Sequence, residues 1–357
     1  MRFPVPVFAA AAMAVALAPL TAQSQLVLPQ SLTNCWGQSS SSLLGRDSTR
    51  TQLIFAQPFA ANTVIRGVGF RRAASTSDSA SFTIDIEIRM SSTTATPGAL
   101  SPTFANNVGS DEVVVLPRQT VTVPDMPANR STGRFAEFPL ATPFTFGTNG
   151  APNICVEVLV YGRSTGASWS TDRIFGGSSG REQLAGIGCG SASIDATSSN
   201  NGPGGAYTAG STVDIDLTGA APNSLAVLFP SLNMSEFPPG NPLPFDLSAL
   251  GAAAGCDLLV SPELEGFGFP TDGAGNANFS TSIPTGVGEV GIGWQWVYQV
   301  PPTASNPLGI ETTANETTFI GPRVATPNAQ YVWDLFDVNA TTGNATTDSC
   351  PVAVFRF

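Results

Sequence analysis

The clearest pattern in the chain is the alternation of apolar and polar side chains in residues 81–90. Every second position is apolar: Phe82, Ile84, Ile86, Ile88 and Met90. The positions between Ile84 and Met90 are charged: Asp85, Glu87 and Arg89. Successive side chains of a β-strand point to opposite faces, so a period of two predicts a half-buried antiparallel strand here.

Shorter runs of the same kind recur along the chain. They cover residues 51–56, 64–70, 113–116, 120–123, 135–140, 154–161, 212–217, 224–229, 257–260, 276–283, 294–300, 317–320, 331–338 and 352–357. Gly, Pro, Asn and Ser separate these runs, and no window of a dozen residues after residue 24 keeps a helical repeat. The pattern predicts an all-β protein with two antiparallel β-sandwich domains, jelly-roll or immunoglobulin-like, in tandem.

The expected division into domains follows from the Gly- and Ser-rich stretch at residues 176–210. Strand patterning resumes only after the segment around Cys189, and 357 residues are enough for two domains. We therefore predict an N-terminal sandwich over residues 25–176, a linker over 177–185 and a C-terminal sandwich over 186–357. The placement of residues 324–357 within this scheme stays open.

Residues 1–24 have the features of a secretory signal peptide. Arg2 precedes an apolar stretch at residues 7–20, and small residues follow it, so we expect cleavage between Ala22 and Gln25. No other stretch approaches the roughly 18 apolar residues that a transmembrane helix needs. The prediction is a secreted protein, extracellular or in the cell envelope, with no transmembrane segment.

The charged residues narrow the range of functions. All 15 basic residues are Arg, there is no His, and 26 acidic residues give a net charge of −11. Without Lys or His, the chain lacks a histidine base, a histidine metal ligand, a Schiff-base lysine and a P-loop lysine. The negative charge argues against nucleic acid as a partner.

Two pairs of carboxylates have strand spacing, Asp85 with Glu87 and Asp214 with Asp216. Residues two apart share a strand face, where such a pair could serve as acid and base on a glycosidic bond. We expect instead that both pairs lie on the solvated face opposite the apolar one. The Asp272 segment offers oxygen ligands for calcium, although Asp-Gly between strands is itself a hairpin signal. We predict no catalytic residues, no metal ligands and no cofactor.

Trp294 and Trp296 would lie on the same face of one predicted strand. Two interpretations are open. The indoles could form a platform on which a polysaccharide stacks, or they could belong to the core of a sandwich, the more common arrangement.

Two parts of the sequence resemble modules of functionally uncharacterised, exported bacterial proteins that occur as large paralogous sets. Residues 186–323 resemble one module through GIGCG (186–190), LPFDLSALGAAAGCDLLVSPE (243–263), TDGAGNANFSTSIP (271–284) and NPLGIETTAN (306–315). GVGFRR (67–72) and NICVEVLVYG (153–162) resemble its companion module. The resemblance implies a disulfide between Cys189 and Cys256, which leaves Cys35, Cys155 and Cys350 for a second bridge.

Together these features predict a secreted, non-enzymatic interaction or structural protein whose partner is an extracellular protein or a polysaccharide. A carbohydrate-binding protein is the alternative. A carboxylate-dependent glycan hydrolase or lyase is the third hypothesis.

Overall fold

A computed structural model describes residues 24–34, 36–40, 43–73, 79–126, 134–164, 169–175, 182–186, 188–198, 207, 210–237, 241–287, 290–320, 328–346 and 349–357. In this part of the chain the strands form antiparallel sheets, and the helical elements are short 3-10 turns at Gln30–Leu32, Phe104–Asn107 and Leu247–Leu250. The predicted all-β class is confirmed. The predicted signal peptide lies outside the described residues except for Ser24, and none of the described helices could cross a membrane.

The first sandwich consists of two large sheets. We call β1-β26-β4-β7 the inner sheet and β24-β23-β3-β8-β5-β6 the outer sheet. The inner strands are Gln25–Leu28 (β1), Ala353–Arg356 (β26), Val64–Arg71 (β4) and Phe135–Thr145 (β7). The outer strands are Asn344–Ala345 (β24), Ala329–Asp334 (β23), Thr49–Phe55 (β3), Asn153–Arg163 (β8), Phe82–Thr93 (β5) and Val113–Val123 (β6). A small sheet joins β2 (Gln38–Ser40), β9 (Thr171–Phe175) and β25 (Ser349–Pro351).

The alternation in residues 81–90 determines which face of β5 is buried. Ile84, Ile86 and Ile88 are buried and share one core with Phe70 and Phe138 of the inner sheet. The charged residues between the isoleucines lie on the opposite face, which is partly exposed. The predicted strand and its orientation are confirmed.

The second sandwich packs a sheet of order β10-β22-β20-β13-β18 against a sheet of order β11-β12-β19. The strands of the larger sheet are Glu182–Ala185 (β10), Asn315–Ile320 (β22), Val290–Gln299 (β20), Leu225–Ser231 (β13) and Phe267–Pro270 (β18), with Ile310–Thr312 (β21) paired to β20. The smaller sheet comprises Ser193–Ser198 (β11), Thr212–Thr218 (β12) and Ala277–Ser282 (β19). Two hairpins join Glu236–Phe237 (β14) to Asn241–Pro242 (β15), and Phe245–Asp246 (β16) to Asp257–Leu258 (β17).

The strand pairing corrects the expected boundaries. The range 186–357 was predicted to form the C-terminal sandwich, but β23, β25 and β26 pair with β3, β9 and β4 of the first sandwich. The second sandwich is therefore inserted in the chain of the first rather than following it. In addition, the end of the expected linker is not a loop: it forms strand β10, which pairs with β22 of the second sandwich. Local alternation predicts that a strand forms but not which sheet receives it.

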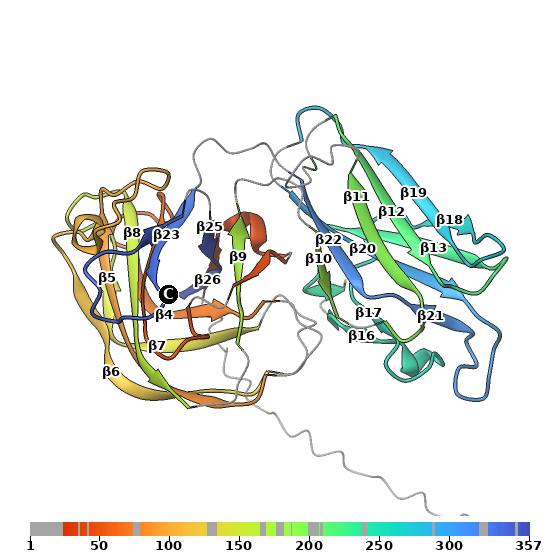
Figure 1. Cartoon of the computed structure of the whole chain (residues 1–357), viewed down its shortest axis with the longest axis horizontal. Helices are drawn as coiled ribbons and strands as arrows, with labels where there is room; N and C mark the ends of the chain where they lie inside the picture. The colour runs from red at the N-terminus through yellow and green to blue at the C-terminus, as the bar shows by residue number, and fades with distance from the viewer. Residues whose placement is uncertain are drawn as a thin grey trace, which may run out of the picture.

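The two sandwiches meet at a buried apolar cluster and lie side by side in Figure 1. Leu32, Trp36 and Val354 of the first sandwich pack there with Met234 and Val260 of the second. The Met234 amide also donates a hydrogen bond to the Asn34 carbonyl, at 3.1 Å. The core covers one side of the inner sheet, and the second sandwich covers part of its other side at this cluster. The second face of the outer sheet is covered by a loop near Ile54 and Val332 and is accessible near Arg89 and Arg118.

Candidate functional site

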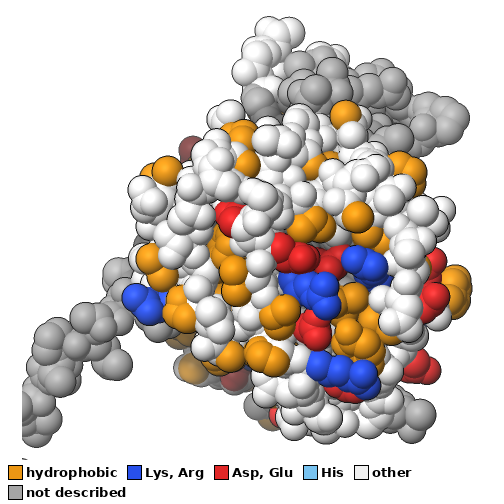
Figure 2. Space-filling model, turned by 90° about the vertical axis from the view of Figure 1, so that its left-hand side faces the viewer, with side chains coloured by type: hydrophobic (Ala, Val, Ile, Leu, Met, Phe, Trp, Pro, Cys, Tyr) orange, Lys and Arg blue, Asp and Glu red, His pale blue; other side chains and the backbone are white. Residues whose placement is uncertain are grey.

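The face of the outer sheet that points away from the core carries a group of charged side chains from four neighbouring strands, β3, β8, β5 and β6. Gln52 of β3 is paired directly with Glu157 of β8, which is paired directly with Arg89 of β5. Directly opposed residues project from the same face, so these side chains form a row across the sheet. Acidic and arginine side chains gather near the centre of this face in Figure 2. The surface is called the charged face here and is defined by Arg50, Gln52, Asp85, Glu87, Arg89, Arg118 and Glu157.

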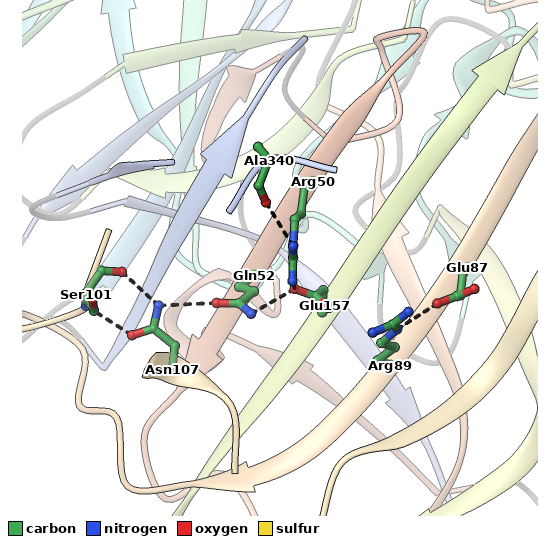
Figure 3. Close-up of polar contacts among 8 residues, drawn as sticks. All are labelled: Arg50, Gln52, Glu87, Arg89, Ser101, Asn107, Glu157 and Ala340. Atoms are coloured by element: carbon green, nitrogen blue, oxygen red, sulfur yellow. Dashed lines mark hydrogen bonds and ion pairs between the residues drawn. The ribbon is translucent and has the colours of Figure 1, made fainter. Parts of the chain in front are cut away.

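Glu157 is the centre of a hydrogen-bond network on this face. Its Oε1 accepts hydrogen bonds from Gln52 Nε2 at 2.8 Å and from Arg50 Nε at 3.0 Å, and Arg50 Nη2 lies 2.9 Å away (Figure 3). The residue is only 1% exposed, and its Oε2 has no hydrogen-bond partner within the described ranges. A buried carboxylate is costly unless it is paired, so Arg50 and Gln52 make this position tolerable.

The same network attaches two loops to the sheet. Arg50 Nη1 donates to the Ala340 carbonyl at 2.9 Å, and its guanidinium lies 4.6 Å from the centre of the Phe104 ring. On the other side, Asn107 Nδ2 donates to Gln52 Oε1 at 3.2 Å and to the Ser101 carbonyl at 2.8 Å. One end of the charged face is therefore fixed by bonds that join segments far apart in the sequence (Figure 3).

The other end of the face is more accessible. Arg89 Nε donates to Glu87 Oε1 at 2.6 Å, and Arg118 Nη2 donates to Asp85 Oδ2 at 2.7 Å while its guanidinium stacks 3.9 Å from the centre of the Tyr161 ring. The side chains of Arg89 and Arg118 are 34% and 55% exposed. Both arginines are thus oriented by a carboxylate but remain within reach of a partner.

Glu112 directly precedes β6 beside the charged face, and the charges of that face affect its pKa. Burial raises the pKa of Glu112 above its usual value, and the nearby Glu157 carboxylate raises that pKa further. A second negative charge close by disfavours ionisation. Glu112 therefore binds a proton more readily than a glutamate in free solution.

Substitution of Glu157 by Ala is expected to destabilise the protein by about 1–3 kcal/mol, because the buried amide of Gln52 loses its acceptor and Arg50 loses its counter-charge. Urea unfolding measures the loss. Asp85→Ala is the matched control on the same face: it breaks an exposed pair and should cost much less. Equal losses in the two variants would show that the network around Glu157 does not support the sheet.

The structure places Trp294 and Trp296 in the core of the second sandwich. They are 4% and 0% exposed, and Trp294 Nε1 donates to Thr318 Oγ1 at 2.8 Å. β20 lies in the middle of its sheet, and aromatic rings from β18 and β19 cover the indoles. The interpretation as a sugar-stacking platform is therefore wrong, and the interpretation as core tryptophans is correct.

The other acidic motifs form ordinary structural contacts. Asp272 Oδ1 accepts hydrogen bonds from the amides of Ala274 and Asn276, both at 2.8 Å, so the segment forms a turn. Asp216 accepts a hydrogen bond from Asn278 Nδ2 at 2.7 Å on the partly exposed face of β12. Among the described residues, no group of three His, Cys, Asp or Glu side chains is arranged to hold a metal ion.

The predicted disulfide between Cys189 and Cys256 is present, with 4.6 Å between the Cα atoms. Cys155 and Cys350 are free and buried, and burial raises the pKa of both thiols well above the usual value. These two cysteines do not form a second bridge with each other. Cys35 lies outside the described residues.

Sequence reasoning missed Glu157 and Arg50, which organise the charged face. The signal was present in NICVEVLVYG (153–162), where Glu157 is the only charged residue in a strand that is otherwise apolar around it. Such a residue needs a buried partner, and Arg50 and Gln52 share the face of β3 on which Gln52 lies directly opposite Glu157. The partner is distant in sequence, so the pair could not be identified from spacing.

Comparison with known proteins gives no family. No family model matches the chain, and no curated protein matches it. Among solved structures, a Niemann-Pick type C2 protein from the Japanese carpenter ant is similar over 37% of this chain and 96% of its own, with 12% identity and a TM-score of 0.18. A T=1 Penaeus vannamei nodavirus structure is similar over 79% of this chain and 88% of its own, with 11% identity and a TM-score of 0.13. Overlaps of this size assign neither a fold family nor a function to this chain.

Proposed function

We propose that this protein is a secreted, non-enzymatic interaction protein that binds a protein partner through the charged face. The observation that carries the proposal is that Arg89 and Arg118 are each held by a carboxylate and remain exposed, Arg118 over the Tyr161 ring, on the same sheet face that the network around Glu157 fixes at its other end. Arginine and tyrosine are the side chains most often found at the energetic centre of protein interfaces. Groups that are already oriented lose less conformational entropy on binding.

Secretion is supported by the predicted signal peptide and by the disulfide, because disulfides persist mainly in oxidising compartments. A recognition role is supported by the direct pairing of Arg89 with Glu87 and of Arg118 with Asp85, which presents both signs of charge in fixed positions. The carbohydrate-binding alternative no longer has Trp294 and Trp296 as its platform.

The proposal is tested by capturing secreted proteins on the immobilised full-length protein and on two variants, with quantification by mass spectrometry. Arg89→Gln with Arg118→Gln removes the two accessible cations of the charged face. Arg356→Gln is the matched control, because Arg356 forms a partly exposed pair with Glu137 on the inner sheet.

We expect one defined protein to be retained by the unmodified chain and by Arg356→Gln, to be lost from the double variant, and to be released by added salt. Equal capture by all three proteins would contradict the role of the charged face. Release of reducing sugar or unsaturated products from a panel of glycans would contradict the non-enzymatic assignment.

A further inference from the structure

A groove runs along the turn at residues 146–152 at one end of the first sandwich, with residues 57–61 on one side of the turn and residues 92–94 and 108–110 on the other. It consists of two adjoining pockets of about 380 and 300 Å³, which share Gly150 and Ala151. We call it the end groove and define it by Gln57, Phe59, Phe146, Asn149, Gly150 and Ala151. Its size is at the lower end of the range typical of small-molecule sites.

One wall of the end groove is aromatic and firmly held. The Phe59 ring packs edge-on against Phe146 and Phe357, with ring centres 5.5 Å apart in each case, and against Phe355 at 5.1 Å. Phe146 and Phe355 are buried, whereas Phe59 is partly buried and lines the groove. The ring is therefore presented to the groove in one position.

The remaining lining mixes polar side chains with alanine, proline, valine and glycine residues and carries no charge. No acidic residue and no arginine contributes to either pocket in the described part of the chain. Gln57 and Ser110 line the groove, and their side chains form no hydrogen bond with any described residue. The groove thus offers a carboxamide beside Phe59 in one pocket and the Ser110 hydroxyl in the other, and no charged side chain lines either pocket.

Four residues around the groove have a left-handed backbone conformation. Gln57 has a φ of 42° and Asn62 a φ of 66°, and Gly147 and Gly150 on the facing turn have φ values of 76° and 77°. Left-handed conformation costs a residue such as glutamine roughly 1–2 kcal/mol. The backbone N–H of Gln57 donates a hydrogen bond to Asn153 Oδ1 at 3.2 Å. This bond helps to hold the Gln57 backbone, so the side-chain carboxamide of Gln57 stays at the groove.

We propose that the end groove binds a neutral saccharide. The apolar CH face of a sugar ring packs on an aromatic ring, and its hydroxyl groups need uncharged donors and acceptors such as the Gln57 amide and the Ser110 hydroxyl. The uncharged lining disfavours uronic acids, sulfated sugars and phosphates. This site is separate from the charged face and has a different class of ligand, so it goes beyond the proposed function and does not depend on it.

The test is calorimetric titration of the full-length protein with a panel of neutral oligosaccharides: gluco-, manno-, xylo- and galacto-oligosaccharides. Gln57→Gly removes the carboxamide, and glycine accepts a φ of 42° without strain. Gly150→Asn adds a side chain to a residue that lines both pockets. A Cβ at Gly150 meets no atom within 4 Å, and asparagine tolerates positive φ, so the variant should fold. Gly286→Asn is the matched control in the second sandwich, with a φ of +91° and the same open surroundings.

We expect at least one neutral oligosaccharide to bind at millimolar concentration or better. Its affinity should fall about tenfold or more in Gln57→Gly and Gly150→Asn and remain unchanged in Gly286→Asn. Thermal unfolding shows whether each variant is folded, and Gln57→Gly should be as stable as the unmodified protein or more so.

Two results would overturn the proposal: no binding by any member of the panel, or binding that persists in Gly150→Asn. The Arg89→Gln and Arg118→Gln variant should bind the saccharide normally. Failure of this proposal is thereby distinguishable from failure of the charged face as a protein-binding surface.

Discussion

Replacement of Arg71 by Met is expected to destabilise the protein by about 3–5 kcal/mol, since it leaves a buried carboxylate without its counter-ion. Arg71 and Asp172 are completely buried, and Arg71 Nε and Nη2 each lie 2.7 Å from Asp172 Oδ2. Arg71 Nη1 also donates to the Leu32 carbonyl at 2.6 Å, and Asp172 Oδ1 accepts from the Gly37 amide at 3.0 Å. The pair therefore connects β4 and β9 to the N-terminal segment that contacts the second sandwich.

The loss should depend on pH. Burial raises the pKa of Asp172 to about 6, while the charge and hydrogen bonds of Arg71 limit the rise. Without Arg71 this pKa goes higher still. The folded protein then holds a proton that the unfolded chain has released, so stability increases as pH falls from the folded pKa toward about 4. The destabilisation by Arg71→Met should therefore be smaller at pH 5 than at pH 7.5.

Urea unfolding followed by circular dichroism at both pH values measures this effect. Addition of Asp172→Asn to Arg71→Met removes the unpaired charge but keeps an acceptor for the Gly37 amide, and it should recover part of the loss at pH 7.5. A loss below about 1 kcal/mol at neutral pH, or the same loss at both pH values, would show that the pair is not a structural centre of the sandwich.

Removal of the Cys189–Cys256 disulfide by a double substitution to Ser should destabilise the second sandwich by about 4 kcal/mol, because the bridge closes a loop with a sequence separation of 67. Cys256 is also buried with Leu247, Ala252 and Leu258, so a serine hydroxyl there adds a desolvation cost. The measurement is the urea midpoint of the unmodified protein and of the variant, each with and without reductant.

Reductant should lower the midpoint of the unmodified protein toward that of the variant and leave the variant unchanged. Cys155→Ala controls for the effect of losing a buried thiol that forms no bridge. A midpoint that reductant does not change in the unmodified protein would contradict the stabilising role of the disulfide.

The sequence predicts most strands because one face of each is buried, as residues 81–90 show. It does not predict that β26 returns to lie between β1 and β4, since pairing between distant strands leaves no local pattern. The same limit explains the tryptophans. Alternation places Trp294 and Trp296 on one face but does not show that a second sheet covers that face.

Only part of the charged face could be predicted from the sequence. Asp85, Glu87 and Arg89 follow from the alternation along β5, but Glu157 reaches Arg50 only through the register of β8 with β3. The Cys189–Cys256 pair was predicted from the resemblance to the exported bacterial proteins. The spacing of the cysteines alone leaves many pairings open.

The most direct test of the charged face is photo-crosslinking from a single position. Thr120 is exposed on β6 directly opposite Asp85, and Ser280 is exposed on β19 of the second sandwich opposite Asp214. A photoreactive residue at position 120 should crosslink one secreted protein in a salt-sensitive manner, and the same residue at position 280 should not. Crosslinking of that protein from position 280 but not from position 120, or equally from both, would contradict the account.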